Sequence, residues 1–276
     1  MKYAAAITFF NPTDNNIKQV CKYSTMFDFI LIYDNSESQA EQLSELKYYD
    51  NIIYFYNSKN DGLPVAYNFL LGETQKLNID FMCTLDQDSE FLYEDIIIMK
   101  SMIESFEDNE LSRIGIIAPF IDYSFSSTRR NNIKSVEWVI TSGAFLNLRV
   151  IRKNNIFYDE YYFIDRFDID FCKQVRKHGL KIIVNENAVL NQRLGTKGYF
   201  GHSQHSPFRH YYIARNRYYY NYKYFSSLKA FELSFLQTIK HILVVLFFES
   251  DRFSKIRNIT KGIYDYRIYE KVGDKR

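Results

Sequence analysis

Two aspartates follow a buried apolar segment, and their spacing suits the binding of a metal ion. Asp86 and Asp88 come directly after the run Ile79–Leu85. Residues i and i+2 of an extended chain point to the same side, so the sequence predicts that the two carboxylates converge beyond the end of a strand. Carboxylate oxygens are ligands of hard divalent cations, which in turn bind phosphate oxygens. The alternative is an acidic turn in which Ser89 and Glu90 cap the following helix.

A second acidic cluster could supply a base. Asp165, Asp168 and Asp170 lie at the start of a predicted helix over Arg166–His178, where carboxylates complement the helix dipole. Asp168 and Asp170 flank the apolar Ile169, so the acidic side chains of this cluster cannot all face solvent together. Plain capping of the helix N-terminus is the alternative explanation of this cluster.

The elements that position these carboxylates alternate between short apolar runs and helical patterns. The strict alternation of strand and helix predicts βαβ units with a parallel sheet. The predicted strands are Tyr3–Phe10, Phe27–Tyr33, Ile52–Tyr56, Ile79–Leu85 and Ile114–Pro119, and the predicted helices are Asp14–Thr25, Ser38–Tyr48, Leu63–Lys76 and Leu92–Phe106. Ligands of open α/β sheets bind beyond the carboxyl ends of the strands, so the polar residues after each strand are candidates for binding.

The pattern changes after Pro119. The sequence predicts an extended stretch over Ser135–Leu148, a left-handed Gly179 ending the Arg166–His178 helix, and short strands at 181–185 and 188–190. From Phe208 onward the segments are helical and basic. We therefore expect an α/β domain over residues 1–205, which would bind the ligand and carry the reaction, and a basic, aromatic helical region over residues 206–276.

Composition excludes several classes of protein. Hydrophobic residues make up 46% and charged residues 25% of the 276 residues, which is typical of a folded globular chain and not of a disordered one. The three cysteines are widely spaced and form no CxxC, so neither a disulfide framework nor a zinc site is expected. A reducing, cytoplasmic compartment is the expectation, and the segment Tyr3–Phe10 is typical of a buried strand and not of a signal peptide.

Charge is unevenly distributed along the chain. Residues 191–276 hold 16 basic and 6 acidic side chains, a balance of +10, whereas residues 1–100 hold 7 and 15, a balance of −8. Phe225–Phe248 has apolar residues at helical spacing with Lys229 and Lys240 among them. This segment either packs on the rest of the protein or lies in an anionic membrane surface, and it is not expected to cross a bilayer.

Taken together, the motifs resemble those of family 2 glycosyltransferases with a GT-A fold, most like bacterial rhamnosyltransferases. The resemblance covers about residues 3–225. Its pieces are Thr8–Pro12, Tyr33–Ser36, Asn60–Asn68, Leu85–Ser89, Thr141–Gly143, Phe163–Gly179, Arg193–Gly195 and Arg209–Asn216. It implies an α/β fold of GT-A type, a Rossmann-like, mainly parallel sheet with flanking helices, followed by a C-terminal helical extension.

The resemblance also implies roles for individual residues. Asp34 would bind the pyrimidine base of a nucleotide-sugar, Phe10 and Pro12 would wall the base, and Asn60 would lie near the ribose and phosphates. Asp86 and Asp88 would hold Mg²⁺ or Mn²⁺ and the diphosphate, with Asp88 most directly on the metal.

Other roles concern the reaction and its acceptor. Asp168 would be the catalytic base, Arg209 and Arg215 would clamp the diphosphate, and Ser142, Gly143 and Asp165 would lie on the acceptor side. Family members often carry a His just before the Arg-Leu-Gly segment, where this chain has Asn191-Gln192, so His202 and His205 are candidates for a further metal ligand.

The implied activity is inverting transfer of L-rhamnose from dTDP-rhamnose to a surface polysaccharide or lipid-linked oligosaccharide, in the cytoplasm or at the inner face of the cell membrane. Another nucleotide-sugar, such as a UDP-hexose, is the nearest alternative. A glycoside hydrolase would use Asp88 and Asp168 as a carboxylate pair. A nucleic-acid-binding module would use the basic end, against which the acidic first hundred residues argue, and no nucleic acid partner is expected.

Overall fold

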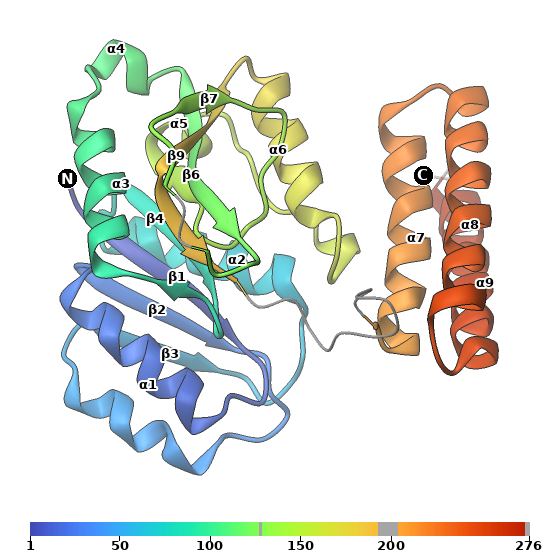
Figure 1. The fold of residues 1–276 in the computed structure, drawn as a ribbon, viewed down its shortest axis with the longest axis horizontal. Coiled ribbons are helices and arrows are strands. Elements are labelled where there is room, and N and C mark those ends of the chain that lie inside the picture. The colour runs from blue at the N-terminus through green and yellow to red at the C-terminus, as the bar shows by residue number, and fades with distance from the viewer. Residues whose placement is uncertain (127–128, 193–203, 274–276) are drawn as a thin grey trace. The chain divides into compact units, whose positions relative to one another are not determined.

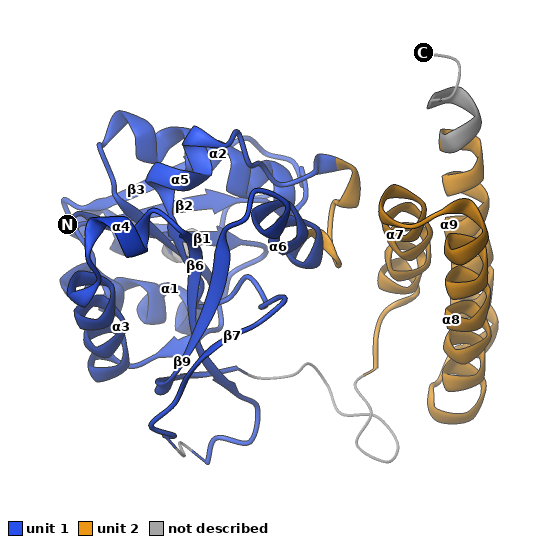
Figure 2. Ribbon diagram, turned by 90° about the horizontal axis from the view of Figure 1, so that it is seen from above, with its two compact units in different colours: residues 1–160, 168–193 blue, residues 161–167, 194–276 orange. Residues whose placement is uncertain are grey.

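The computed structural model describes residues 1–126, 129–192 and 204–273. These residues form two compact units (Figure 2). The first unit comprises residues 1–160 and 168–193, and the second comprises residues 161–167 and 194–276. The predicted division at residue 205 falls within the second unit.

The first unit is built on one mixed sheet (Figure 1). The strands are β1 (Tyr3–Phe9), β2 (Phe29–Asp34), β3 (Ile52–Tyr56), β4 (Phe81–Asp86), β5 (Glu90–Phe91), β6 (Ile114–Asp122), β7 (Ile133–Ser135), β8 (Phe145–Asn147) and β9 (Lys181–Asn191). They lie in the order β3-β2-β1-β4-β8-β6-β9-β5, and β7 pairs with β9. Strands β1 to β4 run parallel, as do β6 and β9, whereas β8 is antiparallel to both β4 and β6.

Helices cover both faces of this sheet. They are α1 (Asp14–Lys22), α2 (Leu63–Lys76), α3 (Tyr93–Ser105), α4 (Asp108–Leu111), α5 (Leu148–Lys153) and α6 (Phe167–Lys177), with short 3-10 helices η1 (Tyr23–Thr25), η2 (Glu41–Tyr48) and η3 (Glu160–Tyr162). Alternate residues of β1 explain the two layers. Ala5 and Ile7 join the core formed with α1 and α3, whereas Ala4 and Ala6 are buried toward the opposite face, where α2 contacts β1 and β2.

Local signals account for the helix ends. Thr13 caps α1 through a reciprocal pair of hydrogen bonds with Asn16, in which Thr13 N donates to Asn16 Oδ1 at 2.9 Å and Asn16 N donates to Thr13 Oγ1 at 3.4 Å. Gly62, at a φ of 84°, precedes α2. Gly179 follows α6 at a φ of 73°, which confirms the predicted left-handed ending.

The predicted strands and helices of the first 120 residues are all present, with η2 a 3-10 helix where an α-helical pattern was predicted. Two predictions downstream were wrong. The stretch Ser135–Leu148 is not one extended segment, because the chain turns at Thr141–Ala144 between β7 and β8, with Ala144 N donating to Thr141 O at 3.1 Å. The two short strands predicted after Gly179 form one strand, β9, which continues through an irregularity in its pairing with β6.

The second unit contains the helices α7 (Pro207–Tyr224), α8 (Ser227–Phe248) and α9 (Arg252–Gly273), as the basic helical pattern predicted. Helices α7 and α9 approach closely at Gly262, where any side chain would collide with the backbone of Tyr211. The apolar core among the helices is small and centres on Ala214, Val245 and Ile259.

Polar side chains fill much of the remaining interior of the second unit. His210 Nδ1 lies 2.7 Å from His241 Nε2, and His210 Nε2 lies 3.0 Å from Glu249 Oε2. Lys255 Nζ donates to the same Glu249 oxygen at 2.7 Å, and Asn221 Nδ2 donates to Ser234 Oγ at 3.0 Å. A chain of hydrogen bonds therefore joins the three helices internally.

Candidate active site

The turn that follows β4 holds the first acidic pair. Ser89 N donates to Asp86 O at 3.1 Å, so the backbone reverses after Asp86 and the alternation expected of an extended chain does not continue to Asp88. Asp86 is half-buried and Asp88 is exposed. Leu92, and neither Ser89 nor Glu90, is the N-cap of α3, so the alternative of an acidic helix cap is wrong.

A buried hydroxyl pair supports this turn. Ser89 Oγ and Ser142 Oγ lie 2.6 Å apart, and Asp86 N donates to Ser89 Oγ at 3.2 Å. The side chain of Ser142 is buried. Ser142 therefore holds the turn at Asp86 through Ser89, and its predicted place on the acceptor side stays a prediction.

Gly143 lets the loop at Thr141–Ala144 approach β4. It has a φ of 80°, and an added Cβ would lie 2.8 Å from Leu190 Cδ1 and 2.9 Å from Pro119 Cγ. Its N–H donates to Thr84 O at 2.7 Å. A side chain at this position would both strain the backbone and collide with its neighbours, so only glycine fits.

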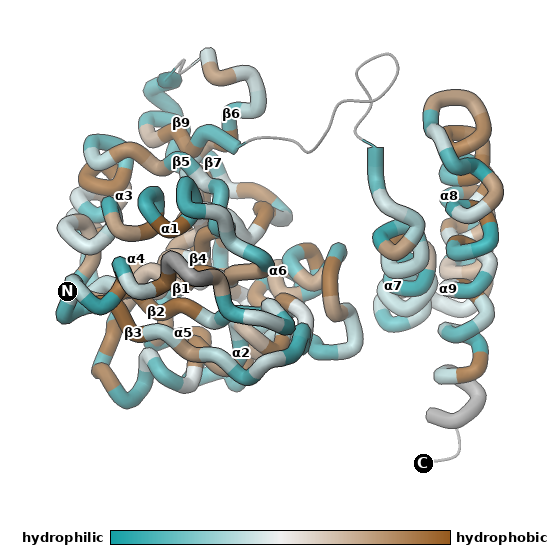
Figure 3. The backbone as a smooth tube through the Cα atoms, turned by 90° about the horizontal axis from the view of Figure 1, so that it is seen from below, coloured by the Kyte–Doolittle hydropathy of each residue, from teal (hydrophilic) through white to brown (hydrophobic). Residues whose placement is uncertain are grey.

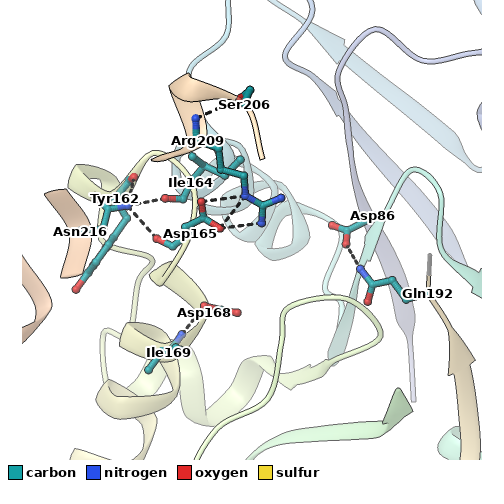
Figure 4. A network of polar contacts seen from close by, with 10 residues as sticks. All are labelled: Asp86, Tyr162, Ile164, Asp165, Asp168, Ile169, Gln192, Ser206, Arg209 and Asn216. Atoms are coloured by element: carbon teal, nitrogen blue, oxygen red, sulfur yellow. Dashed lines mark hydrogen bonds and ion pairs between the residues drawn. The ribbon is translucent and has the colours of Figure 1, made fainter. Parts of the chain in front are cut away.

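The end of β9 reaches the end of β4 through a side chain (Figure 4). Gln192 Nε2 donates to Asp86 Oδ2 at 2.9 Å. Among the residues that the structure describes, Gln192 Oε1 and Asn191 Oδ1 are buried without a hydrogen-bond partner. An unpaired buried carbonyl oxygen is costly, so oxygens of this kind are suited to a ligand that replaces water.

This donor set fits a hard divalent cation. Mg²⁺ is usually held by one or two carboxylates together with water and substrate phosphates, and amide oxygens are acceptable ligands as well. Asp86 and Gln192 offer oxygens of both kinds, and the exposed Asp88 follows in the same turn. Within residues 1–126, 129–192 and 204–273, no group of three or more His, Cys, Asp or Glu side chains is close enough to bind a metal ion alone. The site therefore suits a metal that shares its coordination with a phosphate-bearing ligand.

The residue between the two aspartates connects this turn to β1. Phe10 N donates to Gln87 Oε1 at 2.9 Å, and Gln87 Nε2 donates to Phe10 O at 3.2 Å. The ring of Phe10 is half-exposed, whereas Pro12 is buried. Phe10 thus lies at the same edge of the sheet as the acidic turn, with an aromatic face accessible to a ligand.

Asp34 ends β2 and is fully buried. Its Oδ1 accepts from Ser36 N at 2.8 Å, and its Oδ2 accepts from the hydroxyl of Tyr54 at 2.6 Å. Burial, followed by the hydrogen bond to Asp34, raises the pKa of Tyr54, so this hydroxyl stays a proton donor. The carboxylate is therefore held rigidly at the end of β2, and its predicted contact with a base stays a prediction.

Asn60 begins the turn that leads into α2. Its Oδ1 accepts from Gly62 N at 3.0 Å. Asn35 spans the same turn, because Asp61 N donates to Asn35 Oδ1 at 3.1 Å and Asn35 Nδ2 donates to Gly62 O at 3.3 Å. The polar ends of β2 and β3 are thereby connected at the sheet edge where β1 and β4 end.

The predicted base lies in the first turn of α6. Asp168 is half-buried, and its Oδ1 accepts from Ile169 N at 2.8 Å. Asp170 is fully buried and accepts from Gln174 Nε2 at 2.7 Å, so it is occupied within α6. Of these two carboxylates, Asp168 is the more accessible.

Tyr123 connects the two acidic clusters and was missed by sequence reasoning. Burial raises the pKa of its phenol, and the charges of Asp168 and then Asp86 raise it further. The two carboxylates therefore lie within electrostatic reach of one side chain. Tyr123 directly follows β6, so the rule that ligands bind beyond strand ends could have found it.

Asp165 and the two predicted phosphate-binding arginines belong to the second unit. Arg209 donates to both oxygens of Asp165, with Nη2 2.9 Å from Oδ1 and Nε 3.2 Å from Oδ2 (Figure 4). Arg215 Nη2 donates to the carbonyl oxygens of Tyr161 and Tyr162, and its guanidinium lies 4.6 Å from the ring centre of Tyr212. Both arginines therefore have protein partners here, and their contact with a diphosphate stays a prediction.

Asn216 holds the segment that precedes Asp168 in the chain. Its fully buried Nδ2 donates to the carbonyl oxygens of Tyr162 at 2.9 Å, Ile164 at 2.5 Å and Asp165 at 3.0 Å. Three residues of this segment have positive φ, namely Phe163 (61°), Asp165 (59°) and Arg166 (66°). A positive φ is costly for residues other than glycine. The three hydrogen bonds of Asn216 therefore stabilise a strained backbone.

The roles of the two candidate histidine ligands stay predictions. His205 lies in the second unit with its ring 6.1 Å from that of His210, and burial, then the charge of Arg209, lower its pKa. His202 and the segment Arg193–Gly195 lie outside the described residues.

Comparison with solved structures shows the fold. The chain is similar to S. aureus TarS 1-349 in complex with UDP-GlcNAc, with a TM-score of 0.58 and 13% identity over 96% of this chain and 80% of that one. It is also similar to GalNAc-T7 with UDP, GalNAc and Mn²⁺, with a TM-score of 0.59 and 13% identity over 80% of this chain and 50% of that one. A further structure of S. aureus TarS gives a TM-score of 0.55 at 14% identity, and the match spans only 40% of its length.

Comparison with curated protein sequences gives no significant match. The mixed α/β sheet with flanking helices and C-terminal helices is that of a GT-A glycosyltransferase, as predicted. The sequence profile of glycosyl transferase family 2 matches residues 13–181, which is more than half of the chain. The chain therefore belongs to glycosyl transferase family 2.

Proposed function

We propose that this protein transfers L-rhamnose from dTDP-rhamnose, with inversion, to a surface polysaccharide or lipid-linked oligosaccharide. The proposal is supported by the family membership and by the acidic turn at the end of β4, where Asp86 accepts from Gln192 Nε2 at 2.9 Å. Asp168, in the first turn of α6, acts on the same side chain as Asp86, because the charges of both raise the pKa of Tyr123. A diphosphate-binding carboxylate and a base within reach of one side chain are the two groups that single-step displacement requires.

Donor binding is assigned to the edge where β1, β2 and β4 end. Phe10 offers its exposed ring face to the base, and Asp34, at the end of β2, is the acceptor that we assign to the N3–H of a pyrimidine. Asp86 and Asp88, with the oxygen of Gln192, would hold Mg²⁺ or Mn²⁺ beside the diphosphate. A divalent ion stabilises the negative charge that develops on the leaving oxygen.

Proton removal is assigned to Asp168. A sugar hydroxyl is a poor nucleophile until a carboxylate takes its proton as the new bond forms. Asp170 is fully buried and bonded to Gln174, so it cannot fill this role in its place. Inversion follows because one base and one leaving group suffice, and no covalent nucleophile is required.

A UDP-hexose is the second candidate donor. The similar structures named above contain UDP-GlcNAc, or UDP with GalNAc. The same edge of the sheet would accommodate either pyrimidine. Family membership favours transfer from a nucleotide-sugar over glycoside hydrolysis and over nucleic acid binding.

The acceptor is proposed to be a growing saccharide, and lipid linkage would place the enzyme at the inner face of the cell membrane. A panel of nucleotide-sugars tests the function directly, by measuring release of nucleoside diphosphate with and without Mn²⁺. Turnover with dTDP-rhamnose supports the proposal, and turnover with UDP-hexoses alone supports the second candidate. Hydrolysis of a simple glycoside without any nucleotide would contradict both.

A further inference from the structure

Helix α8 presents an apolar face to the outside of the helical unit. Eight large apolar side chains share this outer face of α8, which we define as Leu228, Phe231, Phe235, Leu236, Ile239, Leu243, Leu246 and Phe247. Leu228 is 87% exposed and Phe247 is 69% exposed. By length and composition α8 could cross a membrane, and only 11% of its most apolar stretch is buried. Figure 3 colours α8 by the hydropathy of its residues.

The opposite face of α8 is the more polar one. Its buried residues are Ala230, Ser234, His241 and Val245. Ser234 accepts from Asn221 of α7, and His241 bonds to His210, also of α7. The helix thus buries hydroxyl and imidazole groups while it exposes leucine and phenylalanine, which is the reverse of a water-soluble helix. A large exposed apolar face of this kind indicates an interaction surface.

The exposed charges of the three helices are mostly positive. From residue 223 to residue 269 the exposed basic residues are Lys223, Lys229, Lys240, Arg252, Arg257, Lys261 and Arg267, whereas the exposed acidic residues are Glu232 and Asp251. Lys229, Glu232 and Lys240 lie on α8 itself, so the basic residues outnumber the acidic one on this helix too. Apolar side chains flanked by lysine and arginine are typical of helices that lie in the surface of an anionic bilayer.

We infer that the outer face of α8 binds the surface of an anionic lipid bilayer, with the helix lying in the plane of the membrane. Charge decides between lipid and a second copy of the chain, because two copies joined through this face would bring together two segments that each carry a balance of +10. Crossing the bilayer is disfavoured, because Lys240 would enter the hydrocarbon and His241 would have to leave its buried contact with His210. The inference goes beyond the proposed transfer reaction and does not depend on it.

Substitution is a better test than truncation. Deleting residues 226–276 would remove Glu249 and His241, which are the partners of the buried His210 on α7. A truncated chain could therefore fail to bind lipid merely because α7 unfolds. Exposed side chains of α8 can be changed without touching these contacts.

The main experiment is sedimentation of the 276-residue chain with vesicles of phosphatidylcholine alone and with about a third of phosphatidylglycerol. We expect binding to the anionic vesicles that weakens with salt, because the attraction is screened over a Debye length of about 8–10 Å. The double variant Phe231→Ser, Phe235→Ser should lower the partition coefficient about tenfold or more, because two apolar rings are no longer removed from water on binding. Lys229→Glu with Lys240→Glu should lower it on anionic vesicles and hardly change it on neutral ones.

The control is a matched pair of exposed aromatic residues in the first unit. Tyr48 and Phe157 are 84% and 55% exposed. Tyr48→Ser with Phe157→Ser should leave vesicle binding unchanged. Far-UV circular dichroism and melting of each variant show that the helices remain folded.

A fluorescent label locates the contact. The cysteines of the chain, Cys21, Cys83 and Cys172, are buried, so a polarity-sensitive dye reacts preferentially with an added Phe235→Cys. Its emission should shift to the blue with anionic vesicles. The inference is overturned if the unmodified chain ignores anionic vesicles, or if the outer-face and control variants bind alike. A dimer that the outer-face variant dissociates, without lipid binding, would assign this face to a second copy instead.

Discussion

Gln192 donates a hydrogen bond of 2.9 Å to Asp86, and so connects the ends of two strands whose residues lie 106 positions apart in the chain. The short strand β5 makes this possible, because it directly follows the Asp86 turn and pairs Glu90 with Asn191 of β9. Gln192 thereby occupies the place beside the acidic pair where the resemblance leads one to look for a histidine. Its amide both orients Asp86 and offers an oxygen.

Replacing Gln192 tests this arrangement. Gln192→Leu should weaken Mn²⁺ binding about 10–100-fold, which is the usual effect of losing a group that orients a metal ligand. Gln192→His should bind Mn²⁺ more tightly than Gln192→Leu. Titration of Mn²⁺ followed by electron paramagnetic resonance, with UDP or dTDP present, measures both. Gln75→Leu, on the exposed side of α2, is the control.

Removing the metal should stop the reaction. The carboxylates of Asp86 and Asp88 repel a diphosphate when no cation lies between them, so excess chelator should abolish transfer and Mg²⁺ or Mn²⁺ should restore it. The measurement is release of nucleoside diphosphate. Full activity in excess chelator would show that Asp86 and Asp88 act without a cation.

Asn216 should matter for the segment before Asp168. Asn216→Asp replaces the donor of three hydrogen bonds with a carboxylate that faces three carbonyl oxygens. Each buried group left unpaired costs about 1–3 kcal/mol. We expect a lower melting temperature and faster proteolysis near Phe163–Arg166. Asn131→Asp, at an exposed position, should change neither quantity.

The helical unit should lose stability in mild acid. Burial lowers the pKa of His241 to about 3, and the charge of Arg217 contributes. Between that value and the unfolded pKa of about 6.5, the unfolded chain binds a proton that the folded chain does not, so the free energy of unfolding falls as pH falls. The slope approaches about 1.4 kcal/mol per pH unit for one histidine.

Urea unfolding at pH 7.5, 6.0 and 5.0, followed by circular dichroism, checks this sign. His241→Gln should have a shallower dependence on pH, whereas His178→Gln, at an exposed position of the first unit, should behave like the unmodified chain. Equal slopes for all three proteins would show that His241 is protonated in the folded state as readily as in the unfolded one.

Most of the sheet could be predicted from the sequence, because βαβ units appear in a sequence as short apolar runs that alternate with helical patterns. The run Leu63–Lys76 was predicted with its observed bounds, since Gly62 and Pro64 mark its start. Ser135–Leu148 was not, because its apolar residues are typical of a strand while Gly143 allows a left-handed turn that depends on Thr84 and Leu190.

The candidate site could be predicted from the sequence only in part. The positions of Asp86 and Asp168 follow from strand and helix ends, but the contacts that organise them join distant segments. No local sequence pattern predicts these side-chain hydrogen bonds, which join Tyr54 to Asp34, Ser142 to Ser89 and Gln192 to Asp86.

The orientation of α8 likewise depends on contacts that no local sequence pattern encodes. Its periodicity predicted an apolar stripe, and only the packing of His241 on His210 shows that the stripe faces outward.

The central claim is that Asp168 removes the acceptor proton while other residues bind the donor. The most direct test compares Asp168→Asn with the unmodified protein in two measurements, turnover with saturating donor and acceptor, and the dissociation constant of the nucleotide-sugar. We predict that turnover falls at least about 100-fold, as expected for loss of a general base, while the dissociation constant changes little. A variant that keeps more than about a hundredth of the turnover, or that loses donor binding in parallel, would contradict the assignment.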